Sequence, residues 1–228
     1  EYLVRTPAAQ LSYVGPQFNT EMEAYLVANY DTQEILAGKN IDFKRPMASL
    51  TKVMTGYQLM MDGIGFNKST TYNSSIHRSS YHMYRIAEGE RVRNGDLMYA
   101  MLTSSLNTPS RMLVNSKENQ ESAFIQRMNT QAQLWGLTNT RFTDTSGFDS
   151  GNQSTPRDYL TIFSKASKDT NMRKYLGAAS YTYSEIEDTD GKPDHFDTHS
   201  NQLVGQGDLP YTIIASKTGF LYEAGTCL

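Results

Sequence analysis

The sequence predicts an α+β fold in which a helical lobe separates early strands from late strands. Residues 23–40 read as a β-hairpin, the middle of the chain carries helix patterns with cap signals, and residues 211–220 form a β-rich run. Because the helices interrupt the strands, the early and late parts of the sheet must meet in space. We therefore expect an antiparallel sheet flanked by helices.

The composition is that of a soluble globular protein of one large domain, or of one domain with an inserted lobe. The chain has 228 residues, 38% hydrophobic and 20% charged, with a formal net charge of −3. This balance gives no basic field for nucleic acid, and no apolar run is long enough to span a membrane. The start, "EYLVRTPAAQ", lacks the pattern of a signal peptide, as expected of a cytoplasmic protein or of a secreted one whose leader is gone.

The first elements follow from local patterns. Residues 1–20 are expected to form an extended lead-in. The hairpin has one strand at 25–27, a turn at "DTQ" and a return strand at "EILAG". Pro46 precedes a helix, "SLTKVMTGYQLMM", that ends near Gly63, and residues 64–95 are expected to be irregular or to form short strands.

The later elements are three helices and a strand. "NGDLMYAMLTSS" is expected to be a helix capped by Asn94 or Asp96. Residues 119–137 form an amphipathic helix stopped by Gly136, and "STPRDYLTIFSKASKD" is a helix with a Ser/Thr cap and Pro156 in its first turn. Residues 211–220, "YTIIASKTGF", are expected to be a buried strand.

Ser49 and Lys52 are the first candidate catalytic pair. They are three residues apart at a helix start, among apolar neighbours, so they would share a face and lie within mutual reach. A nucleophile and its base need this arrangement. The pattern S-x-x-K is weak alone, because a helix cap followed by a lysine that extends to water would look the same.

Two further motifs accompany that pair. Lys217-Thr218-Gly219 ends the β-rich run, where glycine would allow a close approach of a ligand, although a strand entering a turn is the simple alternative. An S-x-N occurs at Ser105-Leu106-Asn107 and again at Ser150-Gly151-Asn152. We favour Ser105 and Asn107, because they follow a helix that can hold them, and regard Ser150 as a decoy in a polar loop.

In this order, S-x-x-K, S-x-N and K-T-G resemble the signature of penicillin-binding proteins and serine β-lactamases. Three longer segments, at 24–55, 128–163 and 199–228, resemble the low-molecular-mass D-alanyl-D-alanine peptidases. The resemblance implies a β-lactamase/transpeptidase-like catalytic domain over residues 21–228, and leads us to expect that its C-terminal strands and helix are lacking. A sheet without those strands would expose an edge and an apolar face.

The resemblance also implies roles for individual residues. Ser49 would be the nucleophile and Lys52 its base, made neutral by burial and by the charge of Lys217. The remaining roles are proton relay by Ser105, substrate binding by Asn107, Lys217, Thr218 and Gly219, and an oxyanion hole of two backbone N–H groups, those of Ser49 and Phe220.

The implied function is that of a periplasmic or otherwise extracytoplasmic serine D,D-peptidase, with peptidoglycan stem peptides as substrates and β-lactams as covalent inhibitors. The sequence "SSLN", with Thr108 after Asn107, and the short spacing from Ser49 to Ser105 favour the endopeptidase branch. The alternatives are a carboxypeptidase, a class A-like β-lactamase and a non-catalytic peptidoglycan-binding homologue. The only E-x-x-x-N, from Glu90 to Asn94, precedes Ser105, which argues against the β-lactamase.

No cofactor and no metal are expected. His195 and His199, with Asp194 and Asp197 nearby, match a metal site only weakly in a loop-like stretch. The single cysteine, Cys227, excludes an internal disulfide and is read as a strand residue.

Overall fold

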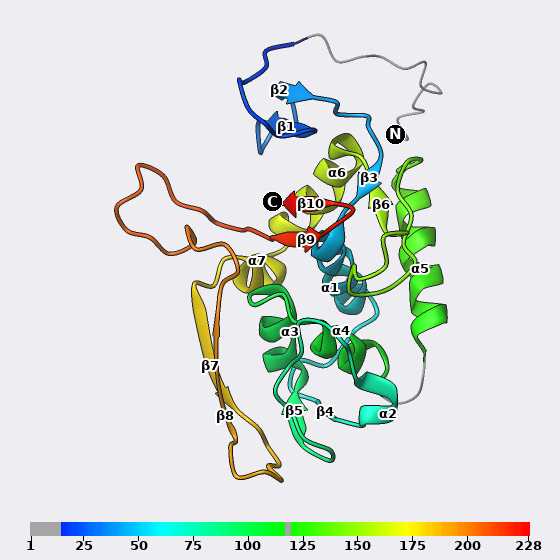
Figure 1. Cartoon of the computed structure of the whole chain (residues 1–228), viewed down its shortest axis with the longest axis vertical. Helices are drawn as coiled ribbons and strands as arrows, with labels where there is room; N and C mark the ends of the chain where they lie inside the picture. Colours follow the sequence, from blue (N-terminus) through cyan, green and yellow to red (C-terminus); the bar gives the residue numbers. More distant parts are fainter. Residues whose placement is uncertain (1–14, 117–119) are drawn as a thin grey trace.

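A computed structural model of the chain describes residues 15–116 and 120–228 and confirms the α+β class (Figure 1). The helical elements are η1 (Ala48–Leu50), α1 (Thr51–Met61), α2 (Ser74–His77), α3 (Asn94–Leu102), α4 (Asn107–Val114), α5 (Glu121–Leu134), α6 (Pro156–Lys168) and α7 (Thr170–Leu176). The strands are β1 (Tyr25–Ala28), β2 (Ile35–Lys39), β3 (Arg45–Pro46), β4 (Ser69–Thr71), β5 (Arg91–Arg93), β6 (Gln153–Ser154), β7 (Ser180–Ser184), β8 (Asp194–Thr198), β9 (Gly219–Leu221) and β10 (Gly225–Cys227).

The strands of the described residues form antiparallel pairs rather than one continuous sheet. The pairs are β1–β2, β3–β6, β4–β5, β7–β8 and β9–β10. The expected strand at 211–220 is wrong in extent, because regular pairing begins only at Gly219. Residues 211–218 have β-forming side chains but no neighbouring strand in the described chain, and such side chains form a strand only beside a partner.

Helix α1 lies at the centre of the molecule, with α3, α5 and α6 around it (Figure 1). Eight of its eleven residues are buried, including polar ones, as is typical of a helix enclosed on all sides. Gly56 allows close packing here, since a methyl group at this position would lie 3.1 Å from Met172 and 3.2 Å from Leu102. Helix α1, which carries Lys52 and directly follows the η1 turn that carries Ser49, is thus held by α3 and α7.

Several expected elements are confirmed at their predicted places. The hairpin at 23–40 is β1–β2, and α1, α5 and α6 occupy the predicted helices. The Thr155 side chain caps α6 by accepting a hydrogen bond from the Asp158 amide.

The predicted cap of α3 is wrong. Arg93 occupies that position without a side-chain cap, and the Asn94 side chain instead accepts from Thr70 and donates to the Gly65 carbonyl. Long-range hydrogen bonds have outcompeted the local one.

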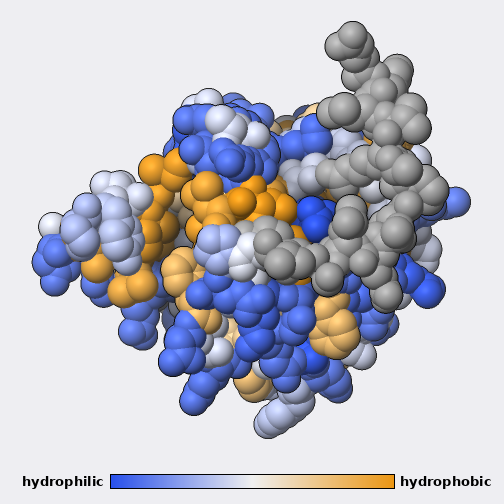
Figure 2. Space-filling model, turned by 90° about the horizontal axis from the view of Figure 1, so that it is seen from above, coloured by the Kyte–Doolittle hydropathy of each residue, from blue (hydrophilic) through white to orange (hydrophobic). Residues whose placement is uncertain are grey.

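The terminal strand pairs expose large apolar side chains, namely Val27 and Leu36 in β1–β2 and Phe220, Tyr222 and Leu228 at β9–β10. Seen from the β1–β2 end, the surface carries a contiguous apolar area (Figure 2). Within the described residues, no helix has the length and apolarity needed to cross a membrane. Of the expected lead-in at 1–20, residues 1–14 lie outside the described residues.

Candidate active site

Ser49 and Lys52 meet as the sequence predicts. Ser49 lies in η1, which runs directly into α1, and Lys52 is fully buried in the first turn of α1. The Lys52 Nζ and the Ser49 Oγ are 2.8 Å apart. The alternative, a lysine that extends to water, is therefore excluded, and the two groups are in hydrogen-bonding contact.

Two further acceptors surround the Lys52 amine. Its Nζ donates to the Asn107 Oδ1 at 2.6 Å and to the Ser146 carbonyl at 2.7 Å. Asn107 is the first residue of α4, an element that the sequence pattern did not reveal. Its Nδ2 donates to the Tyr81 carbonyl at 2.8 Å, which leaves its second N–H for another acceptor.

Ser105 and Lys217 form a second serine–lysine pair. The buried Lys217 Nζ donates to the Ser105 Oγ at 2.6 Å and to the Thr218 carbonyl at 2.7 Å. Ser105 connects α3 to α4 in a left-handed conformation, with φ of 65°, which is uncommon for a residue with a side chain. Thr218 donates in turn to the Ser200 Oγ at 2.6 Å.

The loop at 143–152 completes the first pair, and the sequence reading missed it. The Asp144 carboxylate accepts from the amides of Ser146, Gly147 and Asp149, and so orients the Ser146 carbonyl that Lys52 contacts. Asn152 accepts from the amides of 143 and 144. Asn152 of the second S-x-N thus stabilises this loop. The many turn-forming residues around Ser150 were the sequence signal that could have indicated an ordered loop here.

Two glycines bring the backbone close to Ser49. A Cβ on Gly147, whose φ is 82°, would lie only 1.8 Å from the Ala48 carbonyl oxygen. A Cβ on Gly219 would lie 3.0 Å from the Ser49 amide nitrogen. The start of β9 and the 143–152 loop therefore flank η1, so that the K-T-G motif lies against the Ser49 amide.

Burial controls the protonation of both lysines. It lowers the pKa of Lys52 to about 7, against the opposing charge of Asp144, which raises it. The pKa of Lys217 lies well below its usual range because of burial and, secondly, repulsion by Lys52. Of the two causes expected for Lys52, burial dominates, whereas the repulsion between the lysines acts on Lys217.

His82 is a site neighbour that the sequence did not single out. Burial lowers its pKa, and the charges of Lys52 and Lys217 add to this effect. Like Ser105, it has a positive φ, here 46°, and its carbonyl accepts from the Asn107 amide at 3.1 Å. His82 is thus a titratable group whose pKa the charges of both lysines lower.

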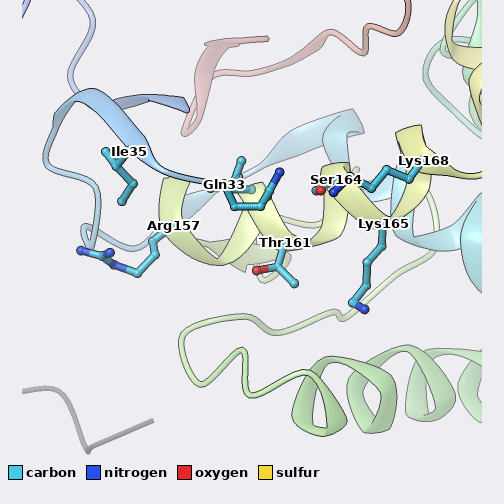
Figure 3. Close-up of a pocket in the computed structure, with 8 residues that line it drawn as sticks. Gln33, Ile35, Arg157, Thr161, Ser164, Lys165 and Lys168 are labelled. Atoms are coloured by element: carbon cyan, nitrogen blue, oxygen red, sulfur yellow. The ribbon is translucent and has the colours of Figure 1, made fainter. Parts of the chain in front are cut away.

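The cavities on the surface differ in their relation to these residues. One of about 420 Å³ lies between the β1–β2 turn and α6 and holds none of the predicted site residues (Figure 3). Its Arg157 is already paired with both carboxylate oxygens of Asp42. A second, of about 440 Å³, is lined by Asp144 and Ser146 and so adjoins the Lys52 contacts.

The remaining sequence alternatives lie elsewhere. Glu90 accepts hydrogen bonds from the Ala87 and Thr189 amides rather than serving Ser49. His195 contacts Glu185, while His199 contacts the Leu176 carbonyl, so the two histidines point to different partners. Cys227 lies in β10, as predicted.

Known proteins resemble the chain in sequence. It is 27% identical over 207 residues to a D-alanyl-D-alanine endopeptidase of Pseudomonas aeruginosa, covering 89% of this chain and 64% of the relative. A D-alanyl-D-alanine endopeptidase of Escherichia coli is 28% identical over 206 residues, with the same coverage. The chain spans slightly less than two thirds of the length of these two relatives.

Solved structures resemble the fold. A cysteine-to-alanine mutant of a Streptomyces DD-transpeptidase superposes with a TM-score of 0.82 at 25% identity, covering 92% of this chain and 85% of that one. The D-alanyl-D-alanine carboxypeptidase of Mycobacterium tuberculosis gives a TM-score of 0.78 at 21% identity, with 90% and 75% covered. The fold is therefore of the transpeptidase-like kind that the motifs implied.

The family model described as D-alanyl-D-alanine carboxypeptidase matches residues 11–228, which include both serine–lysine pairs and the K-T-G motif. The chain belongs to this D-alanyl-D-alanine carboxypeptidase family of peptidases.

Proposed function

We propose that the chain is a serine D,D-peptidase that cleaves peptidoglycan stem peptides through an ester on Ser49. The observation that carries this proposal is the hydrogen bonding of Lys52. A neutral amine has two N–H groups and one lone pair. The acceptors Asn107 Oδ1 and Ser146 O take the two hydrogens, so the lone pair is left facing the Ser49 hydroxyl.

Acylation then needs no histidine. Lys52, with a pKa of about 7, accepts the Ser49 proton while the Oγ attacks the carbonyl of the penultimate D-alanine. The oxyanion that forms would be stabilised by the backbone N–H groups of Ser49 and Phe220, the first of which lies in η1 directly before α1, where the helix dipole favours negative charge.

Collapse of the intermediate breaks the amide bond and leaves the acyl group on Ser49. The leaving amine must gain the proton that Lys52 took from Ser49, and Ser105, which accepts a hydrogen bond from Lys217, would relay it. Water then attacks the ester while the neutral Lys52 accepts a proton from it, and this proton returns to the Ser49 Oγ as the acid product leaves. The proton count therefore balances over one turnover, without any group beyond these side chains and water.

Substrate is held on the Lys217 side. A charged Lys217 has three N–H groups, two of which go to Ser105 and Thr218, which leaves one for a substrate carboxylate. Burial disfavours the protonated form of Lys217, and the negative charge of a bound substrate carboxylate would favour it again. Thr218 orients neighbouring polar groups, Gly219 allows the peptide to lie along β9, and the second N–H of the Asn107 amide is directed to a substrate amide.

Within this family, cleavage of crosslinks is the activity we favour. Relatives named for either activity match most of the chain, with 89% covered by the two endopeptidases and 91% by a D-alanyl-D-alanine carboxypeptidase of Bacillus subtilis. The preference for the endopeptidase comes from the "SSLN" sequence followed by Thr108 and from the short spacing between Ser49 and Ser105. Trimming of a terminal D-alanine is the second candidate. Both activities place the protein outside the cytoplasm, where peptidoglycan lies, and make β-lactams covalent inhibitors.

Digestion of crosslinked muropeptides separates these activities. We expect purified protein to convert muropeptide dimers into monomers, and the Ser49→Ala variant to leave the dimers intact. Release of free D-alanine with intact dimers would establish the carboxypeptidase instead. A folded protein that changes neither dimers nor uncrosslinked pentapeptides would contradict the proposed function.

A further inference from the structure

A cavity beside the Ser49 site is not used by the proposed reaction. It has a volume of about 440 Å³ and is lined by two segments, residues 74–80, at and after α2, and the loop at 143–152. Both segments reach the site, because the Ser146 carbonyl accepts from the Lys52 Nζ and the Tyr81 carbonyl accepts from the Asn107 side chain. The wall of the cavity is therefore two hydrogen bonds from the Ser49 hydroxyl, and the cavity can receive part of a molecule bound there.

Arg78 presents an unpaired guanidinium to this cavity. The residue is exposed, and within residues 15–116 and 120–228 its side chain has neither an ion pair nor a hydrogen bond. The neighbouring Ser80 hydroxyl has no partner in the same part of the chain. Arg111 also lines the cavity, and its Nη1 donates to the Arg78 carbonyl at 3.0 Å. A guanidinium with free N–H groups is suited to bind a carboxylate.

The acidic side chains at the cavity are already bonded within the protein. Asp144 accepts from three backbone amides of its own loop. Glu121 accepts from the Thr145 hydroxyl at 3.0 Å, and Glu88, beside the cavity, accepts from the Ser74 amide at 2.7 Å. Among the described residues, the charge left unpaired at the cavity is therefore positive, which fits an anionic ligand.

Two exposed rings lie where the cavity meets the site. Tyr81 directly follows Ser80 and is 47% exposed, while Phe148 lines the cavity and is 50% exposed. Their ring centroids are 6.1 Å apart, so the pair connects the two walls. Exposed aromatic side chains offer apolar area to a ligand. A chain that is aliphatic along its length and anionic at its end would match the rings and the guanidinium together.

We propose that this cavity binds a carboxylate-bearing side chain of the acyl donor, the peptide that forms the ester with Ser49. Arg78 and the Ser80 hydroxyl bind the carboxylate, and Tyr81 and Phe148 contact the aliphatic part. The inference rests on the proposed function and deepens it, since it names a preference for donors with a free side-chain carboxylate over those with an amide or an amine. This carboxylate site lies on the 143–152 side of η1 and is separate from Lys217 on the K-T-G side.

Three thioester acyl donors test this preference, because a thiolate is a good leaving group for an endopeptidase and a carboxypeptidase alike. Each is an acetyl-Xaa-D-alanyl-thioglycolate, in which Xaa has a side chain of four methylenes that ends in a carboxylate, a primary amide or an ammonium group. The release of thiol gives kcat/KM for each donor. For the parent protein, we expect kcat/KM of the carboxylate donor to exceed that of the amide donor about 10-fold, the effect of a hydrogen bond to a charged group, and the ammonium donor to be the slowest.

Arg78→Gln should reduce the ratio of the carboxylate donor to the amide donor to about one, whereas Arg78→Lys, which keeps the charge, should retain most of it. The matched control is Arg173→Gln in α7, away from α2 (Figure 1), which should keep the ratio of the parent. Equal rates of the parent with the carboxylate and amide donors, or an unchanged ratio in Arg78→Gln, would overturn this inference alone. A folded parent that reacts with none of the three donors and with no penicillin would overturn the proposed function and this inference with it.

Discussion

The two serine–lysine pairs of this protein, Ser49–Lys52 and Ser105–Lys217, consist of the same residue types but differ in their hydrogen bonds. Lys52 has three oxygens around its Nζ, from Ser49, Asn107 and Ser146, whereas Lys217 has two, from Ser105 and Thr218. Both amines are buried, and burial lowers the pKa of each. Within residues 15–116 and 120–228, the first amine is therefore enclosed by protein acceptors, while the second, when charged, keeps one N–H with no protein acceptor.

Under the proposed function, this difference would let the two lysines serve different steps. A fully enclosed amine is fixed in direction, which suits a base that must face one hydroxyl. An amine with an open donor position binds a carboxylate, and gains its charge as the carboxylate arrives. We therefore propose that the number of protein acceptors, rather than the residue type, distinguishes the base from the binding group in this site.

Removing each lysine should separate these roles, with the largest effect at Lys52. Lys52→Ala is expected to slow acylation by benzylpenicillin roughly 10³–10⁴-fold, since it deletes the base. Lys217→Ala should cost roughly 10–100-fold, the value of a hydrogen bond to a charged group. Stopped-flow labelling measures both rates, with circular dichroism as the check on folding.

Penicillin methyl ester sharpens this comparison, because it lacks the carboxylate that Lys217 would bind. The Lys217→Ala defect should largely disappear with the ester, whereas the Lys52→Ala defect should persist. Equal defects of the two variants with both compounds would show that the lysines do not divide the work.

Substitution of the two glycines that flank η1 should also have separable effects, mainly on stability at Gly147 and mainly on acylation at Gly219. Gly147→Ala should lower the free energy of unfolding by about 2–4 kcal/mol, because its Cβ would overlap the Ala48 carbonyl in a left-handed backbone. Gly219→Ala meets only a close contact at the Ser49 amide, so we expect about 1 kcal/mol of lost stability but a clear fall in acylation. Urea denaturation and labelling rates give the two values. Full acylation by the Gly219→Ala variant would show that the close approach of β9 to Ser49 does not contribute to the reaction.

The pH dependence of acylation should report Lys52. Protonated Lys52 cannot accept a proton, so the rate should fall as pH drops through about 7 and level off above it. Asp144 raises the pKa of Lys52, so Asp144→Asn should move the midpoint to lower pH. An unchanged midpoint in this variant, or a midpoint near the ordinary lysine value in the parent, would contradict the assignment of the base.

The smallest effects on stability are expected for Thr55 and Ser110, which donate hydrogen bonds to the loop at 143–152. The Thr145 carbonyl accepts from the Thr55 Oγ1 at 2.8 Å and from the Ser110 Oγ at 2.7 Å. Thr55→Val or Ser110→Ala should each cost about 1 kcal/mol of stability. The double variant should cost more than their sum, because the buried carbonyl then loses both partners. Strict additivity would indicate that solvent reaches this carbonyl.

The sequence predicted those parts of the site that depend on local spacing. One helical turn joins Ser49 to Lys52, and the hairpin at β1–β2 and the capped helix α6 follow from short-range patterns. The order of the three motifs then identified Ser105, Asn107 and Lys217. In the structure Asn107 accepts a hydrogen bond from Lys52, and Ser105 accepts one from Lys217.

The sequence could not predict contacts that depend on long-range packing. The Ser146 carbonyl and the Asp144 charge act on Lys52 from a loop whose composition looks like any turn. The Asn94 side chain forms hydrogen bonds with Thr70 and Gly65, in other segments, instead of the predicted helix cap. Residues 211–218 have strand-like side chains but lack a neighbouring strand in the described chain, and propensity alone does not supply one.

The central claim, that Ser49 forms an ester with Lys52 as its base, is tested most directly by the intact mass of the protein after exposure to penicillin. We predict that the parent chain gains the mass of one whole penicillin and keeps it for a long time, and that Ser49→Ala gains none. Labelling of the Ser49→Ala variant, or no labelling of a folded parent chain, would contradict the account, and rapid loss of the label would instead identify a β-lactamase.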